Sequence, residues 1–309
     1  MAAGSSPSQI RPSRSHVTTV GSGMCSLFVD IARFSARGAA PGIWLRADGD
    51  RPKGGTASRV GGVADGVILD AGDARAVAAV AAIRGGDPAA LRRLLAAEPG
   101  LATARIRDGA ATRTLLHVVT DWPGHVPAGP ATVAALVAAG ADVNARFTGA
   151  HAETPLHWAA SCDDVAVLDA LLDAGADIDA GGAVIAGGTA LDDARAFGQW
   201  QAAHRLVERG ARTTIHDAAA LGLTGLLDRH LAARPAPDEL GTALWWACHG
   251  GQRACAERLL EHGADLDHRP PWEDLTPLDA AVRAGAADLA DELRARGAAT
   301  AAARRGPGR

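Results

Sequence analysis

The sequence predicts an all-α repeat solenoid of about seven helical units, some of them degenerate. The first observation is a constant spacing of 21 residues between a Thr and a later Gly, which joins Thr154 to Gly175, Thr189 to Gly210, Thr242 to Gly263 and Thr276 to Gly297. The second is the 3.6-residue period of the apolar positions between them, as in Val165, Leu168, Leu171 and Leu172. One spacing that occurs four times indicates internal repeats of a helical unit.

The unit around Thr154 shows how each position supports this architecture. Thr154 is a suitable N-cap for a first helix, and Pro155 fits the first helical turn, where no N–H is needed. Leu171 lies on the apolar face of a second helix. Gly175 fits the left-handed position that follows a helix, which a Cβ would strain.

Two segments carry a resemblance to a known family. Thr154–Ala160 reads TPLHWAA, and Thr276–Ala281 reads TPLDAA. These residues resemble the ankyrin repeat, which has a TPLHxA signature and a period of about 33 residues. The resemblance covers roughly residues 73 to 299 and implies a helix pair and a β-hairpin finger in each unit. It also implies that His117, His157 and His216 are structural and form hydrogen bonds between neighbouring repeats.

The composition divides the chain into three parts. Residues 1–72 are rich in Gly, Ser, Pro and Arg without a sustained period, which predicts a disordered leader, or a stretch that precedes a later translation start such as Met24. Residues 73–299 form the repeat array, and residues 300–309 are expected to be a disordered tail. An Ala- and Arg-rich chain with one Lys favours a GC-rich bacterial genome, of actinobacterial type.

Three units depart from the common pattern. An insertion rich in Pro and Gly, residues 122–130, is expected as a loop between the helices of the second unit. The finger after Gly210 is missing, and Arg195 occupies a slot that holds small core residues elsewhere, so we expect weak coupling there. Arg294 replaces a buried Leu, as the solvent-facing end of a solenoid requires.

Charge and hydropathy exclude several classes of protein. The net charge of -4 gives no basic stripe for nucleic acid, and no apolar run is long enough for a membrane span. The four Cys residues lack the density of a secreted disulfide scaffold, which predicts a cytoplasmic protein with reduced thiols.

Motifs for catalysis and metal binding are also lacking. Cys248, His249, Cys255 and His262 are close together, but their spacing matches no zinc site, and Cys248 and Cys255 align with small core slots. No nucleophile elbow, metalloprotease motif or phosphate loop is present. We therefore expect no metal, no cofactor and no enzymatic activity.

Aligning the units places several aromatic and acidic residues on the side that ankyrin proteins use for partners. These residues, expected as a concave stripe, are Trp122, Trp158, Phe197 and Trp246, with Asp121, Asp193 and Asp217 beside them. Trp is a favoured interface anchor. The alternative for Trp158 and Trp246 is that they pack half-buried between repeats.

These observations predict a protein–protein interaction scaffold or adaptor, monomeric, with a partner on the concave face. The acidic groups favour a partner with a basic segment. The alternative is small-ligand binding or an enzymatic activity at the insertion, residues 122–130, which convergence of polar groups around His125 would favour.

Overall fold

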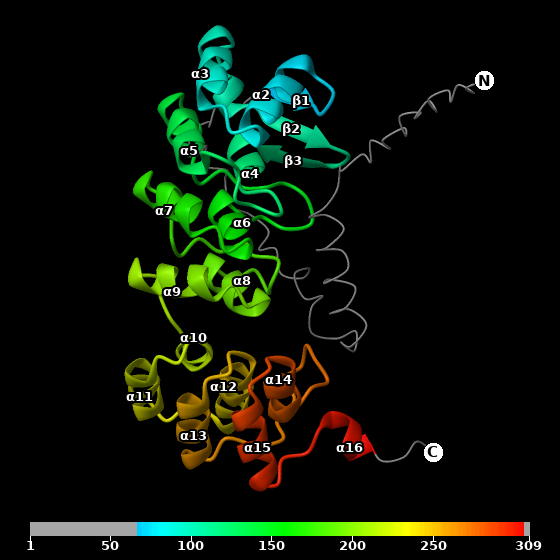
Figure 1. Ribbon diagram of the computed structural model, residues 1–309, viewed down its shortest axis with the longest axis vertical. Coiled ribbons are helices and arrows are strands. Elements are labelled where there is room, and N and C mark those ends of the chain that lie inside the picture. Colours follow the sequence, from blue (N-terminus) through cyan, green and yellow to red (C-terminus); the bar gives the residue numbers. More distant parts are fainter. Residues whose placement is uncertain (1–66, 306–309) are drawn as a thin grey trace, which may run out of the picture.

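The computed structural model describes residues 67–305, and in this range the chain forms a mostly helical stack of helix pairs (Figure 1). Each pair is a helix, a turn and a second helix. The pairs are α2 (Ala74–Arg84) with α3 (Pro88–Ala97), α4 (Leu115–Val119) with α5 (Gly129–Ala138), α6 (Pro155–Ser161) with α7 (Val165–Asp173), α8 (Ala190–Phe197) with α9 (Trp200–Glu208), α10 (Ile215–Ala220) with α11 (Thr224–Ala232), α12 (Pro237–His249) with α13 (Arg253–Glu261), and α14 (Pro277–Arg283) with α15 (Ala287–Ala295).

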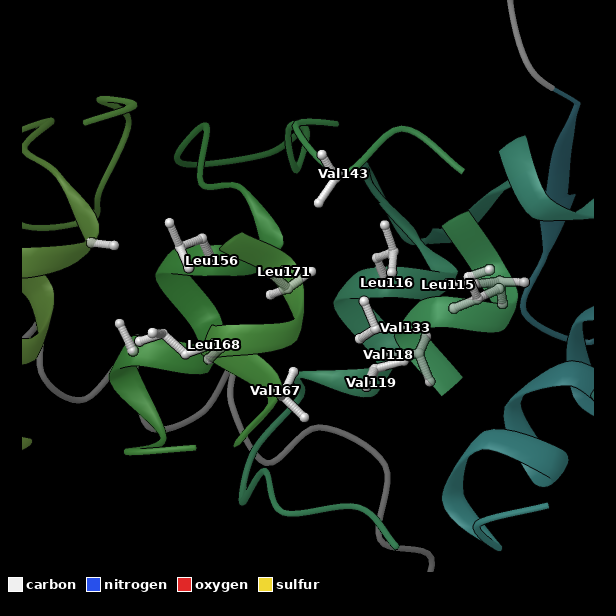
Figure 2. Packing of buried hydrophobic residues seen from close by; sticks show 14 of the residues in the cluster. Leu115, Leu116, Val118, Val119, Val133, Val143, Leu156, Val167, Leu168 and Leu171 are labelled. Carbon is white, nitrogen blue, oxygen red and sulfur yellow. The ribbon is translucent and has the colours of Figure 1, made fainter. Parts of the chain in front are cut away.

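The core lies between two columns of helices. Figure 1 shows α2, α4, α6 and α8 in one column and α3, α5, α7 and α9 beside it, and consecutive helices within each column contact one another. Side chains such as Leu116, Leu156 and Leu171 fill the space between the columns (Figure 2). Leu171 is fully buried, which confirms its expected place on the apolar face of α7.

Capping boxes set the start of the first helix in several pairs. At α8, the Thr189 hydroxyl accepts from the backbone N–H of Asp192 (3.4 Å), and the Asp192 carboxylate accepts from the N–H of Thr189 (2.8 Å). At α10 the same box joins Thr214 to Asp217. The fifth unit therefore starts at Thr214, one residue later than an alignment on Thr213 predicts.

The N-terminal end holds a small three-stranded sheet, in which a β-hairpin finger was expected but the strand added to it was not. Strand β1 (Ile68–Asp70) pairs in parallel with β2 (Arg105–Asp108), which forms an antiparallel hairpin with β3 (Ala111–Thr114). Leu69 on β1 is buried against the core. The array therefore begins before Asp73, and the expected boundary at residue 72 is too late because the apolar side chain of β1 completes the first finger.

The C-terminal end also extends further than expected. The short helix α16 (Ala301–Arg305) follows the last pair. A second short helix, η1 (Leu101–Thr103), lies near the other end of the array, after α3. Ala301 is buried, and its N–H donates to the carboxylate of Asp279 (2.8 Å). The chain from residue 300 to residue 305 is thus anchored to α14, contrary to the expected tail. The rest of that tail, residues 306–309, and the expected leader up to residue 66 lie outside the described residues.

The α10–α11 pair interrupts the array. Only residues 209–214 join α9 to α10, so the expected loss of that finger is confirmed. The finger between α11 and α12 is missing as well, and only residues 233–236 separate these helices. Helix α12 instead begins with an extra turn at Pro237 and reaches 13 residues. The buried apolar residues divide at this pair into two clusters, one from Leu69 to Leu221 and one from Ile215 to Leu293.

Candidate interaction surface

The turns between the two helices of each pair lie along one edge of the stack, which we call the turn edge. It comprises residues 85–87, 120–128, 162–164, 198–199, 221–223, 250–252 and 284–286. Successive turns touch: the side-chain amide of Gln199 donates to the carbonyl oxygen of Ser161 (3.0 Å), and a Cβ on Gly222 would lie 2.4 Å from the side-chain oxygen of Gln252. Neighbouring turns thus touch at several points along this edge.

The insertion between α4 and α5 is bound tightly to this edge. The backbone N–H of His125 donates to the carboxylate of Asp164 (2.7 Å), and its Nε2 donates to the carbonyl oxygen of Cys162 (3.1 Å). A Cβ on Gly124 would lie 2.7 Å from the Cβ of Cys162, and Pro127 packs equally closely on the α2–α3 turn. The insertion is thus an ordered loop held by the pairs on both sides.

Trp122 stands at the start of this loop with 46% of its surface exposed. Its peptide bond to Pro123 is cis. The preceding Asp121 is largely covered and pairs with Arg113 (2.9 Å) and with Arg84 (3.4 Å), whose side chain is half-exposed. Two guanidinium groups around one carboxylate make the surroundings of Trp122 net positive.

Trp158 is buried, so the expectation that it lies on an exposed stripe is wrong. Its ring packs at 5.5 Å from Phe147 and makes an edge contact at 4.9 Å with His117. Its indole N–H donates to the buried carboxylate of Glu153 (2.7 Å). The chain between α5 and α6 folds over the ring and removes it from solvent.

Asp193 is also fully buried and is not a surface acid. Burial raises the pKa of the Asp193 carboxyl well above its usual range, and the neighbouring Glu153 raises it further. Burial works to raise the pKa of Glu153 too, but the contact with His151 (2.9 Å) and the N–H of Val184 (2.8 Å) outweigh it and lower that pKa. The pKa values of these two neighbouring carboxyls are therefore shifted in opposite directions, upward for Asp193 and downward for Glu153.

Trp246 lies in an aromatic cluster of the second core and is likewise buried. It stacks on Trp272 at 5.9 Å and meets Trp245 edge-on at 5.0 Å. The guanidinium of Arg195 lies over its ring, 4.5 Å from the centroid. Phe197, at the end of α8, is half-buried.

Asp217 forms a buried ion pair with Arg195. Arg195 also pairs with Asp192 (2.8 Å), so it joins α8 to α10 while it contacts Trp246 on α12. The weak coupling expected there stays a prediction, but Arg195 itself is ion-paired to both Asp192 and Asp217. It is the main polar link across the interrupted part of the array.

The expected concave stripe thus does not form as an exposed surface. Four of its members are buried, namely Trp158, Trp246, Asp193 and Asp217, while Asp121 is ion-paired and Trp122 is exposed. Both tryptophans are covered by neighbouring chain segments. Phe147, which precedes α6, covers Trp158, and Trp272, which follows α13, stacks on Trp246. Arg84 and Arg113, which set the charge beside Trp122, had no local sequence signal because they come from α2 and β3.

Of the three histidines expected to be structural, His117 and His157 do bond to carbonyl oxygens of the next unit, but Nε2 of His216 has no hydrogen-bond partner, because Asp217 takes the capping position of α10. Burial lowers the pKa of His117 to about 3, and its two ring nitrogens contact the Thr114 hydroxyl (2.8 Å) and the carbonyl oxygen of Glu153 (3.2 Å). Cys248 and Cys255 are fully buried in the second core, as expected for small apolar residues. Within residues 67–305, no group of three or more His, Cys, Asp or Glu side chains is placed to hold a metal ion, and no helix is long and apolar enough to cross a membrane.

Comparisons with known proteins agree with this architecture. A sequence model of ankyrin repeats, in three copies, matches residues 78–182 and 215–302. Among solved structures, the ankyrin repeat domain of human ASB11 is 30% identical over 60% of this chain and 85% of that one, with a TM-score of 0.37. No curated protein matches the chain significantly. Because the matched segments make up more than half of the sequence, the chain belongs to the ankyrin repeat family.

Proposed function

We propose that this protein is a monomeric scaffold or adaptor that binds a protein partner through its turn edge, with Trp122 as an anchor. Ankyrin repeats are generally protein–protein interaction modules, and the family is typically non-enzymatic. The observation that carries the proposal is an exposed tryptophan on an ordered loop. We further propose seven ankyrin units, one for each helix pair, and a cytoplasmic location in a bacterial cell.

Rigidity of the loop is what makes Trp122 a suitable anchor. Tryptophan contributes a large contact area and is enriched at interface hot spots. Because His125 and Gly124 fix the loop against the α6–α7 turn, binding needs little further ordering of the chain. A surface that is already ordered loses less conformational entropy when a partner binds.

The charges around Trp122 change the expected chemistry of the partner. The prediction of a basic segment relied on Asp121, Asp193 and Asp217, of which the last two are buried. Asp121 is neutralised by Arg84 and Arg113. The exposed part of Arg84 favours a neutral or acidic segment beside the tryptophan.

The alternative of a ligand or catalytic site at residues 122–130 has less support. Polar groups do converge on His125, but they are engaged in holding the loop. Asp164 accepts from His125 and also from the backbone N–H of Val167 (3.1 Å) as the cap of α7. We therefore favour the binding role.

The test compares the Trp122→Ala variant with the wild-type chain as baits in an affinity capture from the native host. Partners that the wild type retains and the variant loses are then measured directly. Trp122→Ala should weaken binding at least about tenfold, since truncation of an interface Trp typically costs about 2 kcal/mol or more. Val77→Ala is the control, because Val77 is 52% exposed and lies on α2, away from the turn edge. Equal affinity of the wild type and Trp122→Ala would refute the proposal, provided that melting shows both chains folded.

A further inference from the structure

The array contains a recess at the point where its two apolar cores meet. The recess has a volume of about 250 Å³, and the residues that line it are Gly198, Trp200, His249, Gly250, Arg283 and Ala284. These come from the α8–α9 turn, the start of α9 and the C-terminal ends of α12 and α14, so the recess opens on the turn edge. Two of its walls thus belong to pairs on opposite sides of α10–α11.

The interruption of the array accounts for this recess. Helix α10 is short, and α12 reaches past it to α8, where Nε2 of His249 donates to the carbonyl oxygen of Arg195 (3.3 Å). Trp200 packs against both apolar cores, and it replaces the smaller Val165 of the α6–α7 unit. The recess lies where the C-terminal end of α12 meets the end of α8 and the start of α9.

Planar groups form the walls of the recess. The rings of Trp200 and His249 lie 5.4 Å apart at an angle of 61°. The Arg283 guanidinium stacks 5.4 Å from the ring centroid of Trp245 and pairs with Glu273 through both of its terminal nitrogens. The other three lining residues are two glycines and an alanine, which occupy little volume.

The recess carries no uncompensated charge. The charge of Arg283 is balanced by Glu273. Burial lowers the pKa of His249 to about 4, so the ring is neutral at pH 7. Pockets for drug-sized ligands measure about 300–1,000 Å³, so this smaller space fits a single side chain better than a cofactor. Aromatic rings favour edge and offset contacts with other rings, which these walls provide.

We propose that the recess receives one uncharged aromatic side chain of the protein partner. This inference rests on the proposed function and adds a second anchor on the same turn edge as Trp122. Because both halves of the array line the recess, an aromatic side chain bound there also ties the two halves together. Binding should therefore slow hydrogen exchange around α10.

The test uses the full chain with ¹⁵N-labelled tryptophan and N-acetyl-tryptophanamide as the probe. The indole N–H signal of Trp200, assigned with Trp200→Phe, should shift and saturate as the probe is added, whereas the signal of Trp122 should not. Ala284→Phe fills the recess and should weaken probe binding at least about tenfold. Val282→Phe is the matched control, because Val282 lies two residues before Ala284 at the end of α14, is half-exposed and does not line the recess.

Several outcomes would overturn the inference. These are no saturable shift of the Trp200 signal, an equal shift in the Ala284→Phe variant, or an equal response to N-acetyl-leucinamide. The wild-type titration needs no variant to fold, so a negative result is informative by itself. The probe assay needs no partner, so it is independent of the capture experiment. If the probe does not bind but Trp122→Ala still weakens partner binding, only the role of the recess is refuted. If the probe binds but Trp122→Ala has no effect on partner binding, only the role of Trp122 is refuted.

Discussion

Replacement of Arg195 by Ala tests the link between the two halves of the array. The Arg195 side chain is almost fully buried and pairs with Asp192 and Asp217, and its guanidinium covers the ring of Trp246. The Arg195→Ala variant would leave the carboxylate of Asp217 buried without its cation. Asp217 would keep only the hydrogen bonds from the N–H and the hydroxyl of Thr214 (both 2.7 Å).

The expected cost follows from these contacts. Removal of one partner of a buried ion pair typically costs about 3–5 kcal/mol, since the remaining charge is left uncompensated. The Thr214 bonds soften this loss, and the lost contact with Trp246 adds to it by about 1 kcal/mol. We therefore expect a decrease of about 3 kcal/mol in the free energy of unfolding.

Urea denaturation measures this cost, with Arg205→Ala as the control. Arg205 also pairs with two acids, Asp169 and Glu208, but it is partly exposed, so its loss should cost less than about 1 kcal/mol. Because ankyrin units gain stability from each neighbour, Arg195→Ala should also speed hydrogen exchange in residues 195–235 more than in α6 and α7. A cost for Arg195→Ala no larger than for Arg205→Ala, with unchanged exchange, would refute the reasoning.

Other predictions concern the core, the buried acid and the first strand. Leu171→Ala should cost about 2–5 kcal/mol in urea denaturation and Leu172→Ala clearly less, because only Leu171 is fully buried; equal costs would contradict the packing. Since burial raises the folded pKa of Asp193, its protonated form stabilises the fold in acid. This contribution is lost as the pH rises from 3.8 through that folded pKa. The free energy of unfolding of the wild type, minus that of Asp193→Asn, should therefore decrease as the pH rises over this range. An increase of this difference with pH would contradict the prediction. A chain that starts at Val67 should melt like the full chain, whereas one that starts at Ala71 lacks β1 and should melt several degrees lower; equal melting of the two truncations would argue against a role for β1.

Several features of the fold could be predicted from the sequence because they depend on neighbours within one unit. The Thr caps, the apolar period that places Leu171 inside and the Gly positions that follow second helices, such as Gly175 after α7, are local signals. The insertion at residues 122–130 and the missing finger after Gly210 changed the spacing of those signals, so they were visible too. The structure confirms each of them.

The candidate site was harder to predict because exposure is not a local property. Whether Trp158 is a surface anchor depends on the chain that folds over it, which brings Phe147 into contact from another segment. The same holds for Asp193, whose burial beside Glu153 turns an expected surface acid into a core group with a raised pKa. Trp122 is exposed, as a partner-binding residue needs to be, but it lies in the turn between α4 and α5.

By itself, the sequence determined the repeat architecture, since each helix, cap and turn is encoded within about 33 residues. The tertiary structure alone decided which side chains remain in contact with solvent and which units meet. The capping of α10 by Thr214, the ion pairs of Arg195 and the recess beside Trp200 all arise where α8, α10 and α12 come together. Contacts between residues more than 20 positions apart leave no periodic trace in the chain, so only the folded arrangement reveals them.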